Sequence, residues 1–279
     1  MIKNFKQIME KAQDNGRKKL AVPAPRSRRV SQFLEKAEKA GLIVPILVGE
    51  GGTDKPVTRD VVDAALVMTK NGEADILFQG DAHMQDFTDA LTENEAAVGG
   101  RESLSYISLF ELPSENRIFM LTDTLIQAFP DIKQKVRILE NAIDFAMGLG
   151  IEKPKIAALS AAEIVNFNIP SSVDAAVLAQ MSGRNQLKGI VDGPLDIDSA
   201  SSRERCLRKG IKSPVAGQAD IYFLPDIEAG YSIAEVLIFL GTSISAGALL
   251  GTKYPVVLNL RCESPDSLLL DMALASIRA

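Results

Sequence analysis

The stretch Leu20–Gly49, LAVPAPRSRRVSQFLEKAEKAGLIVPILVG, decides the fold class. It opens with the short apolar run Leu20–Val22, which predicts a strand. Apolar residues then recur at helical spacing from residue 30 to residue 37, and Gly41 ends that helix. The run Ile43–Val48 predicts a second strand. A strand, a helix and a strand in this order are typical of a βαβ unit.

The same alternation continues on the C-terminal side of this unit. Apolar runs predict strands at Asp75–Phe78, Lys155–Leu159, Gly189–Val191, Asp220–Leu224 and Pro255–Leu258. Helical spacing predicts helices at 61–68, 84–91, 132–147, 173–181, 200–209 and 233–240, and a last helix that begins after Ser264. Alternating elements of this kind predict an α/β fold with a mainly parallel sheet, covered by helices on both faces.

One segment departs from the parallel pattern. Ser105–Leu112 and Arg117–Leu121 read as two strands joined by the turn residues Pro113–Asn116, which predicts an antiparallel hairpin. The long helix that follows is expected over residues 132–147. The hairpin and this helix together suggest a domain change near residue 130.

The composition bounds the class of protein. The chain has 279 residues, 46% of them hydrophobic and 24% charged, with a net charge of −5. That length fits one large or two ordinary globular domains. The negative balance argues against a protein that binds nucleic acid or a membrane surface as a whole. An anionic ligand would therefore need local cationic groups.

The cysteine count and the N-terminal segment point to the cytoplasm. Cys206 and Cys262 are too few for a disulfide framework, which fits a reducing compartment. The segment that begins at Met1 reads as an amphipathic helix, without the apolar centre of a signal peptide. No run of about 18 apolar residues exists that would span a membrane.

Polar residues follow most of the predicted strands, where ligands bind in open α/β sheets. These groups are Arg26–Arg29, Gln79–Asp81, Thr122–Thr124, Asp192–Pro194, Asp226–Gly230 and Asn259–Arg261. A single Asp before Gly or Pro is more often a turn or a helix cap. The recurrence at many strand ends favours a site.

The cationic candidates have two interpretations each. Arg26, Arg28 and Arg29 form either a solvated helix face or a clamp for phosphate, whose oxygens a guanidinium binds in pairs. Arg101 is either a surface residue or an anion ligand. We select Arg28 and Arg101 as candidate substrate-binding residues.

Several catalytic motifs are missing from the sequence. His83 is the only histidine and reads as a helix-start residue, and Cys262 beside Arg261 is weak as a nucleophile. The sequence has no Gly-x-Ser-x-Gly elbow, no Cys and His at metal-ligand spacing, and no glycine-rich or Walker phosphate loop. The absent loops disfavour a classical dinucleotide enzyme and a P-loop ATPase.

An ordered set of motifs resembles the phosphate acetyl/butyryltransferase family, and the phosphate butyryltransferase branch in particular. The matching stretches are GEADILFQG (72–80), TDT (122–124), GLGIEKPK (148–155), VDGPL (191–195), GQADIYFLPDIEAG (217–230), SAGALLG (245–251) and PVVLNLR (255–261). The set covers nearly the whole chain.

The resemblance implies a fold related to the isocitrate and isopropylmalate dehydrogenases, with two α/β/α domains around a cleft. The expected domains are residues 1–131 with 251–279, and residues 132–250. The resemblance also implies a homodimer or a higher homo-oligomer. It implies that acyl-CoA and phosphate react directly in a ternary complex, with no metal and no cofactor other than these substrates.

The resemblance assigns roles to particular positions. Arg261 corresponds to the phosphate-binding arginine, and Gly247 and Gly251 to glycines that let the backbone approach the site. The remaining matches lie at signature positions of the cleft, namely Asp123, Thr124, Asp192, Asp226, Glu228 and Gly230.

The sequence departs from the family in two places near Arg261. Leu260 stands where the family commonly has Ser, and Ser267 stands where the acetyltransferase branch has its proposed base, an Asp. Asp266, one residue earlier, is therefore the candidate base. The departures leave open a binding protein that has lost catalysis.

Other enzymes of the fold group also stay open. One is a long-chain acyl-carrier phosphate acyltransferase. Another is a metal-dependent dehydrogenase, for which Asp192 with Asp196 or Asp198 would supply the ligands.

Overall fold

The computed structural model describes residues 1–23, 25–49, 57–94, 104–260 and 264–279. The chain is mixed α/β with mostly parallel strands, which confirms the predicted fold class. It divides into two compact units, Met1–Lys3 with Ser105–Ser243, and Asn4–Leu104 with Ile244–Ala279. Among the described residues, no helix is both long and apolar enough to cross a membrane.

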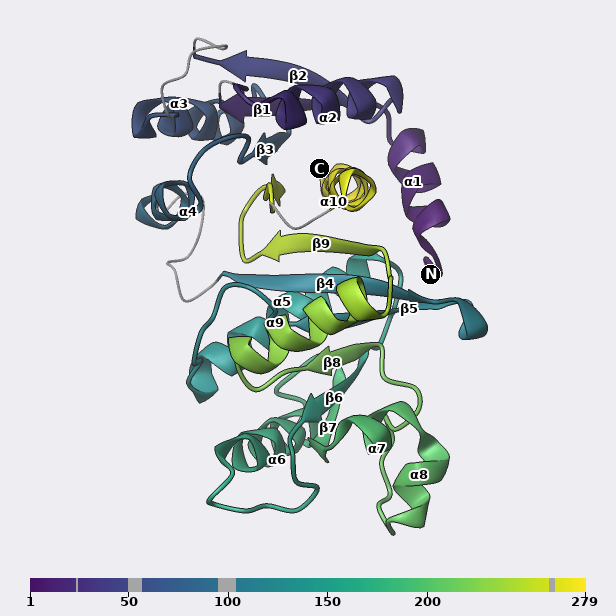
Figure 1. Ribbon diagram of the computed structural model, residues 1–279. Helices are drawn as coiled ribbons and strands as arrows, with labels where there is room; N and C mark the ends of the chain where they lie inside the picture. Colours follow the sequence, from purple (N-terminus) through teal and green to yellow (C-terminus); the bar gives the residue numbers. More distant parts are fainter. Residues whose placement is uncertain (24, 50–56, 95–103, 261–263) are drawn as a thin grey trace. The chain divides into compact units, whose positions relative to one another are not determined.

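The unit that holds residues 4–104 and 244–279 contains a parallel four-stranded sheet in the order β10-β3-β1-β2. Its strands are β1 (Lys18–Pro23), β2 (Ile43–Val48), β3 (Ile76–Phe78) and β10 (Val256–Val257). Its helices are α1 (Phe5–Asp14), α2 (Arg28–Lys39), α3 (Arg59–Lys70), α4 (Met84–Glu93) and α10 (Pro265–Arg278). A further strand, β9 (Ser245–Leu250), packs against α10, and α10 also lies alongside α1 (Figure 1).

Helix α2 shows how local sequence sets these elements. The Ser27 side chain caps the helix by accepting the backbone N–H of Val30 at 3.2 Å. The apolar positions selected from helical spacing are its buried face. One of them, Phe33, packs against Phe78 of β3 with 5.2 Å between ring centroids. The apolar face of α2 therefore packs against the last residue of β3.

The unit that holds residues 105–243 contains the strands β7-β6-β8-β5-β4, side by side in this order. Their bounds are β4 (Ser105–Leu112), β5 (Arg117–Thr122), β6 (Lys155–Leu159), β7 (Ile190–Leu195) and β8 (Ile221–Phe223). Its helices are α5 (Ile132–Gly148), α6 (Pro170–Gly183), α7 (Ile197–Ser201), α8 (Arg203–Arg208) and α9 (Ile227–Glu235). β4 and β5 are antiparallel, as predicted, while the pairs β5–β8, β6–β8 and β6–β7 are parallel.

Three elements differ from the expectation. The helix expected at 200–209 is two short helices, because Ser202 leaves helical geometry and caps α8. The helix expected at 233–240 begins earlier, at Ile227, and ends in a π-helical turn. Strand β9 was not predicted, because every one of its residues is buried and no polar alternation marks it as a strand.

The two compact units divide the chain differently from the expected domain bounds. The expected domain boundary near residue 131 places the β4–β5 hairpin in the same domain as the N-terminal residues. In the structure, the hairpin belongs to the same compact unit as residues 123–243. The reason is strand pairing, because β5 pairs in parallel with β8, about a hundred residues later in the chain. Likewise β9 falls with α10, against which it packs.

Candidate functional site

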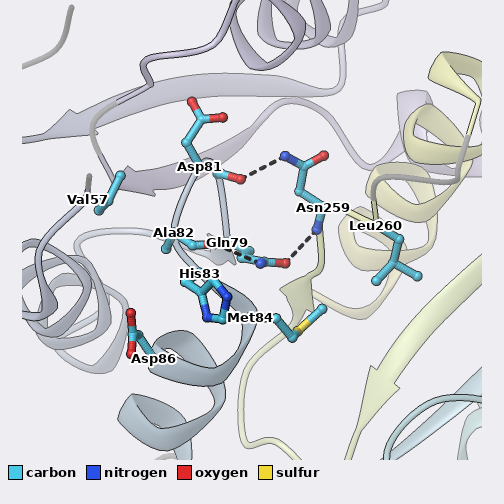
Figure 2. A pocket seen from close by; sticks show the side chains of 10 residues that line it. Val57, Gln79, Asp81, Ala82, His83, Met84, Asp86, Asn259 and Leu260 are labelled. Carbon is cyan, nitrogen blue, oxygen red and sulfur yellow. Dashed lines mark hydrogen bonds between the residues drawn. The ribbon is translucent and has the colours of Figure 1, made fainter. Parts of the chain in front are cut away.

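A pocket of about 460 Å³ lies at the carboxyl ends of β3 and β10 (Figure 2). His83 and Asp86, from the start of α4, stand on one side of it, and Asn259 and Leu260 stand on the other. The other lining residues described are Val57, Gln79, Gly80, Asp81, Ala82 and Met84. This is the position at which open parallel sheets bind ligands.

A network of hydrogen bonds holds the pocket rigid (Figure 2). The Gln79 amide accepts the backbone N–H of Asn259 at 2.9 Å and donates to the Ala82 carbonyl at 2.9 Å. The Asn259 amide donates to the Gly80 carbonyl at 2.8 Å, and its Oδ1 is buried without a partner in the part of the chain that the structure describes. Gly80 has φ +60°, and a Cβ there would lie 3.0 Å from the Pro23 carbonyl oxygen, so glycine suits this turn.

Asp81 fastens the segment after β1 to the pocket. Its Oδ2 accepts the backbone N–H groups of Arg26 at 2.7 Å and of Ser27 at 2.8 Å. Arg29 donates from Nη2 to the Leu260 carbonyl at 2.7 Å. The predicted candidate Arg28 is exposed at the first position of α2. The three arginines therefore differ in their surroundings, although they adjoin in sequence.

In the other unit, Asp123 follows β5 and is 3% exposed. Its carboxylate accepts four backbone N–H groups, from Tyr106, Leu125, Ile126 and Gln127, at 2.8–3.1 Å. Burial raises the pKa of Asp123 to about 6, and the four N–H donors oppose that shift because they stabilise the charged form. The carboxylate thus organises the turn that leaves β5.

Helix α9 packs directly on this turn. Gly230 lies so close to it that a Cβ would sit 2.1 Å from the Asp123 carbonyl oxygen. Asp226 caps the helix by accepting the Ala229 N–H at 2.9 Å, and Glu228 is exposed in its first turn. Thr124 is buried, with its hydroxyl 2.8 Å from that of Ser108. The structure therefore brings together Asp123, Thr124 and Gly230, and Asp226, the N-cap residue of α9, is four residues before Gly230.

Asp192 is half-buried on β7, where it pairs with Ala157 of β6. Strands β6 and β8 lie between it and β5. Its place in the sheet order thus separates Asp192 from the turn at Asp123.

Three carboxylates that could hold a metal ion surround an ammonium group instead. Glu163, Asp196 and Asp198 offer oxygens within 4.8 Å of one another. The Lys209 Nζ donates to Glu163 at 2.9 Å, to Asp196 at 2.6 Å and to Asp198. Burial acts to raise the pKa of Asp196, but the Lys209 ammonium and the Ser199 N–H outweigh it and lower the pKa. The lysine thus binds Asp196 and Asp198, which the dehydrogenase alternative assigned to a metal, whereas its third residue, Asp192, is not part of this group.

The predicted residues near the C-terminus have structural partners. The Gly247 N–H donates to the buried carboxylate of Asp271 at 2.6 Å, and Gly251 turns the chain after β9 with φ +83°. Asp266, the candidate base, is 67% exposed at its side chain and forms an ion pair with Lys36. Ser267 is buried, and its N–H donates to the capping Ser264 hydroxyl at 3.0 Å.

Three predicted residues lie outside the described residues, namely Arg101, Arg261 and Cys262. His83 is the N-cap residue of α4, as expected of a helix-start residue, and it also lines the pocket. The sequence analysis named Asp81 and Asn259 among the strand-end groups without assigning them a role, and it did not name Asp271. The first two follow strands, which is the available signal, whereas Asp271 gives none, because it lies in the middle of α10.

Comparison with known proteins identifies the family. Residues 53–276 match the family described as phosphate acetyl/butaryl transferase. The chain is 33% identical to the phosphate butyryltransferase of Clostridium acetobutylicum, over 100% of this chain and 99% of the relative. It is 32% identical to the phosphate acetyltransferase of Thermotoga maritima, over 99% of each.

Solved structures agree with this relationship. A branched-chain phosphotransacylase from Enterococcus faecalis matches with a TM-score of 0.82 and 29% identity, covering 93% of this chain and 98% of that one. A 4-hydroxythreonine-4-phosphate dehydrogenase from Klebsiella pneumoniae, 11% identical with a TM-score of 0.50, covers 84% of this chain and 76% of its own and shares the fold alone. Because the family model matches residues 53–276 and a relative of 33% identity is covered along the whole chain, this protein belongs to the phosphate acetyl/butyryltransferase family of acyltransferases.

Proposed function

We propose that this protein transfers a butyryl group, or a similar short or branched acyl group, between coenzyme A and inorganic phosphate. A phosphate oxygen attacks the thioester carbonyl, the C–S bond breaks, and the products are acyl phosphate and CoA. The proton released by hydrogen phosphate ends on the CoA thiol, so that the reaction balances without any further reactant. We also propose that it works as a homodimer or higher homo-oligomer in the cytoplasm.

The full-length similarity to a phosphate butyryltransferase carries this proposal. The similarity of the fold to a branched-chain phosphotransacylase supports a short or branched acyl group. The acetyltransferase of Thermotoga maritima is almost as similar, so the choice of acyl group needs its own measurement.

The reaction makes defined demands on the chain. Phosphate and the leaving thiolate are both anionic, so cationic groups must offset their repulsion. The tetrahedral oxyanion needs fixed donors, and much of the rate comes from holding the two substrates in contact. In this proposal Arg261 binds phosphate and Asp266 exchanges the thiol proton. Asp266 would have to leave Lys36 to serve as that base.

The test measures both products with a panel of acetyl-, butyryl-, isobutyryl-, isovaleryl- and longer acyl-CoAs. Free thiol is followed with and without phosphate, and acyl phosphate is trapped as the hydroxamate. We expect phosphate-dependent release of thiol, with the highest kcat/KM for a four- or five-carbon acyl group. Highest kcat/KM for acetyl-CoA would contradict the acyl assignment. No release from folded protein that binds CoA would favour the binding-protein alternative.

Direct transfer has a separate test. Labelled CoA is incubated with butyryl-CoA and enzyme in the absence of phosphate. A ternary-complex reaction leaves the label in free CoA, because no acyl-enzyme forms. Exchange of label into butyryl-CoA at a rate near kcat would show a covalent acyl-enzyme and overturn direct transfer.

A further inference from the structure

Arg26 differs from the other arginines of its segment in the state of its guanidinium. Its Nε and Nη1 are buried, and neither has a hydrogen-bond partner in the described part of the chain. A buried cationic donor without an acceptor is costly, because it gives up water and gains nothing in return. A buried polar group without a partner calls for an explanation, and a bound ligand that supplies the acceptor is one.

The backbone beneath Arg26 is held in place independently of its side chain. Asp81 binds the N–H groups of both Arg26 and Ser27, and its carboxylate comes from the loop that lines the pocket. Asp81 Oδ2 therefore binds the backbone of this segment and not the Arg26 side chain. Arg29 adds a second tie, to the carbonyl of the pocket-lining Leu260. The start of α2 is therefore fixed to the pocket at two points.

The pocket also holds an unused acceptor. The Asn259 amide donates to the Gly80 carbonyl, which fixes the orientation of the amide and leaves Oδ1 buried, with no hydrogen-bond partner among the described residues. Hydrogen phosphate and its monoesters offer both oxygens that accept and, when protonated, a hydroxyl that donates. Two buried guanidinium nitrogens and a buried amide oxygen, on segments joined to one pocket, suit a ligand with this mixture of groups.

Arg26 is not among the described residues that line the pocket, but its segment adjoins the pocket through Asp81 and Arg29. We propose that Arg26 binds a phosphate group of a substrate at the edge of this pocket, as a residue additional to those implied by the family motifs. The inference rests on the proposed function for the identity of the substrate. The phosphate group belongs either to inorganic phosphate and acyl phosphate or to CoA. Both sources present the same oxygens to the guanidinium, which recognises them through paired charged hydrogen bonds.

The test compares Arg26→Ala and Arg26→Lys with Arg17→Ala, which removes an equal charge from an exposed position before β1 in the same unit. We expect Arg26→Ala to raise a substrate KM about tenfold or more, as loss of a charged hydrogen bond does, with a smaller change in kcat. Arg26→Lys should recover part of the loss, because it keeps the charge and loses the paired geometry. Arg17→Ala should match the parent protein.

The two sources separate by substrate. A raised KM for inorganic phosphate in one direction and for acyl phosphate in the other, with KM for CoA unchanged, assigns Arg26 to the reacting phosphate. A raised KM confined to CoA and acyl-CoA assigns it to a phosphate of the coenzyme. The inference is overturned if folded Arg26→Ala shows unchanged KM values for all substrates. It is also overturned if Arg28→Ala weakens substrate binding and Arg26→Ala does not.

A binding measurement keeps this inference independent of turnover. The unfolding temperature is followed with increasing inorganic phosphate or CoA, against potassium chloride at equal ionic strength. We expect one of the two ligands to stabilise the parent protein and Arg17→Ala, and to stabilise Arg26→Ala far less. Should the protein lack acyl transfer, this result still upholds Arg26 while the proposed function fails. Equal stabilisation of all variants overturns the role of Arg26.

Discussion

Replacing Gly230 by Ala tests whether α9 and the turn at Asp123 are as tightly packed as the structure shows. The new Cβ would lie 2.1 Å from the Asp123 carbonyl oxygen and 3.2 Å from the Thr124 Cα. Real Cβ atoms essentially never lie within 3.0 Å of a non-bonded heavy atom from another part of the chain, so about 1 Å of movement is required. The obstacle is backbone, and it cannot turn away as a flexible side chain would.

The magnitude follows from two opposing effects. Overpacking of this kind costs about 1–3 kcal/mol, and the four N–H bonds to the Asp123 carboxylate make the turn resist movement. Alanine in place of glycine gains about 1 kcal/mol within a helix. We therefore expect Gly230→Ala to lower the free energy of unfolding by up to roughly 2 kcal/mol. Displacement of Asp123 and Thr124 should also lower kcat for acyl transfer.

Gly148→Ala is the matched control, because Gly148 is also helical and a Cβ there meets nothing within 4 Å. We expect this variant to be as stable as the parent protein or up to about 1 kcal/mol more stable. The assay is denaturant unfolding of both variants, with the midpoint and the slope m compared. Equal stability of Gly230→Ala and Gly148→Ala would refute the close approach of α9 to the turn.

Three further substitutions test other contacts. Burial raises the pKa of Asp123 from 3.8 to about 6, so the folded state binds a proton at this carboxyl more readily than the unfolded state does. The contribution of Asp123 to the free energy of unfolding should therefore fall as the pH rises from about 4 to 6. Asp123→Asn should remove up to about 3 kcal/mol of that pH dependence in denaturant unfolding, and parallel pH profiles would contradict it. Lys209→Met should destabilise the protein at pH 7, and progressively less as acid protonates the carboxylates. The reason is that the pKa of Asp196 is lowered in the folded protein, so its stabilising effect is present above about pH 4 and is lost on acidification. An acid profile parallel to that of the parent protein would argue against this ion-pair cluster. Arg261→Ala should raise KM for phosphate at least about tenfold, since a charged hydrogen bond contributes about 1.5–3 kcal/mol, and unchanged kinetics in folded protein would remove Arg261 from the site.

The β4–β5 hairpin and strand β9 show how far sequence reasoning reaches. The hairpin was predictable because two apolar runs flank a turn of suitable residues, and both signals are local. Strand β9 was missed because it is buried along its whole length, so the periodicity that marks a half-buried strand is absent. Helices α7 and α8 were merged because the break between them depends on a single capping residue, Ser202.

In the candidate site, too, local features could be predicted from the sequence, whereas the packing of the side chains could not. Strand ends could be located from the sequence, and they include Asp81, Asp123 and Asn259. The sequence could not separate Arg26 from Arg28, because adjacent arginines have the same chemistry. Their difference in burial comes from the packing around them.

The sequence by itself determined the alternation of strands and helices, the α/β class and the membership of the family, because these depend on local spacing and on ordered motifs. Only the tertiary structure decided which groups meet. Asp81 binds an N–H 55 residues away, and Lys209 binds a carboxylate 46 residues away. Gly230, in the helix after β8, lies against Asp123, which follows β5, because these two strands pair side by side. Contacts between residues so distant in the chain carry no periodicity, and they form only when the sheets bring their partners together.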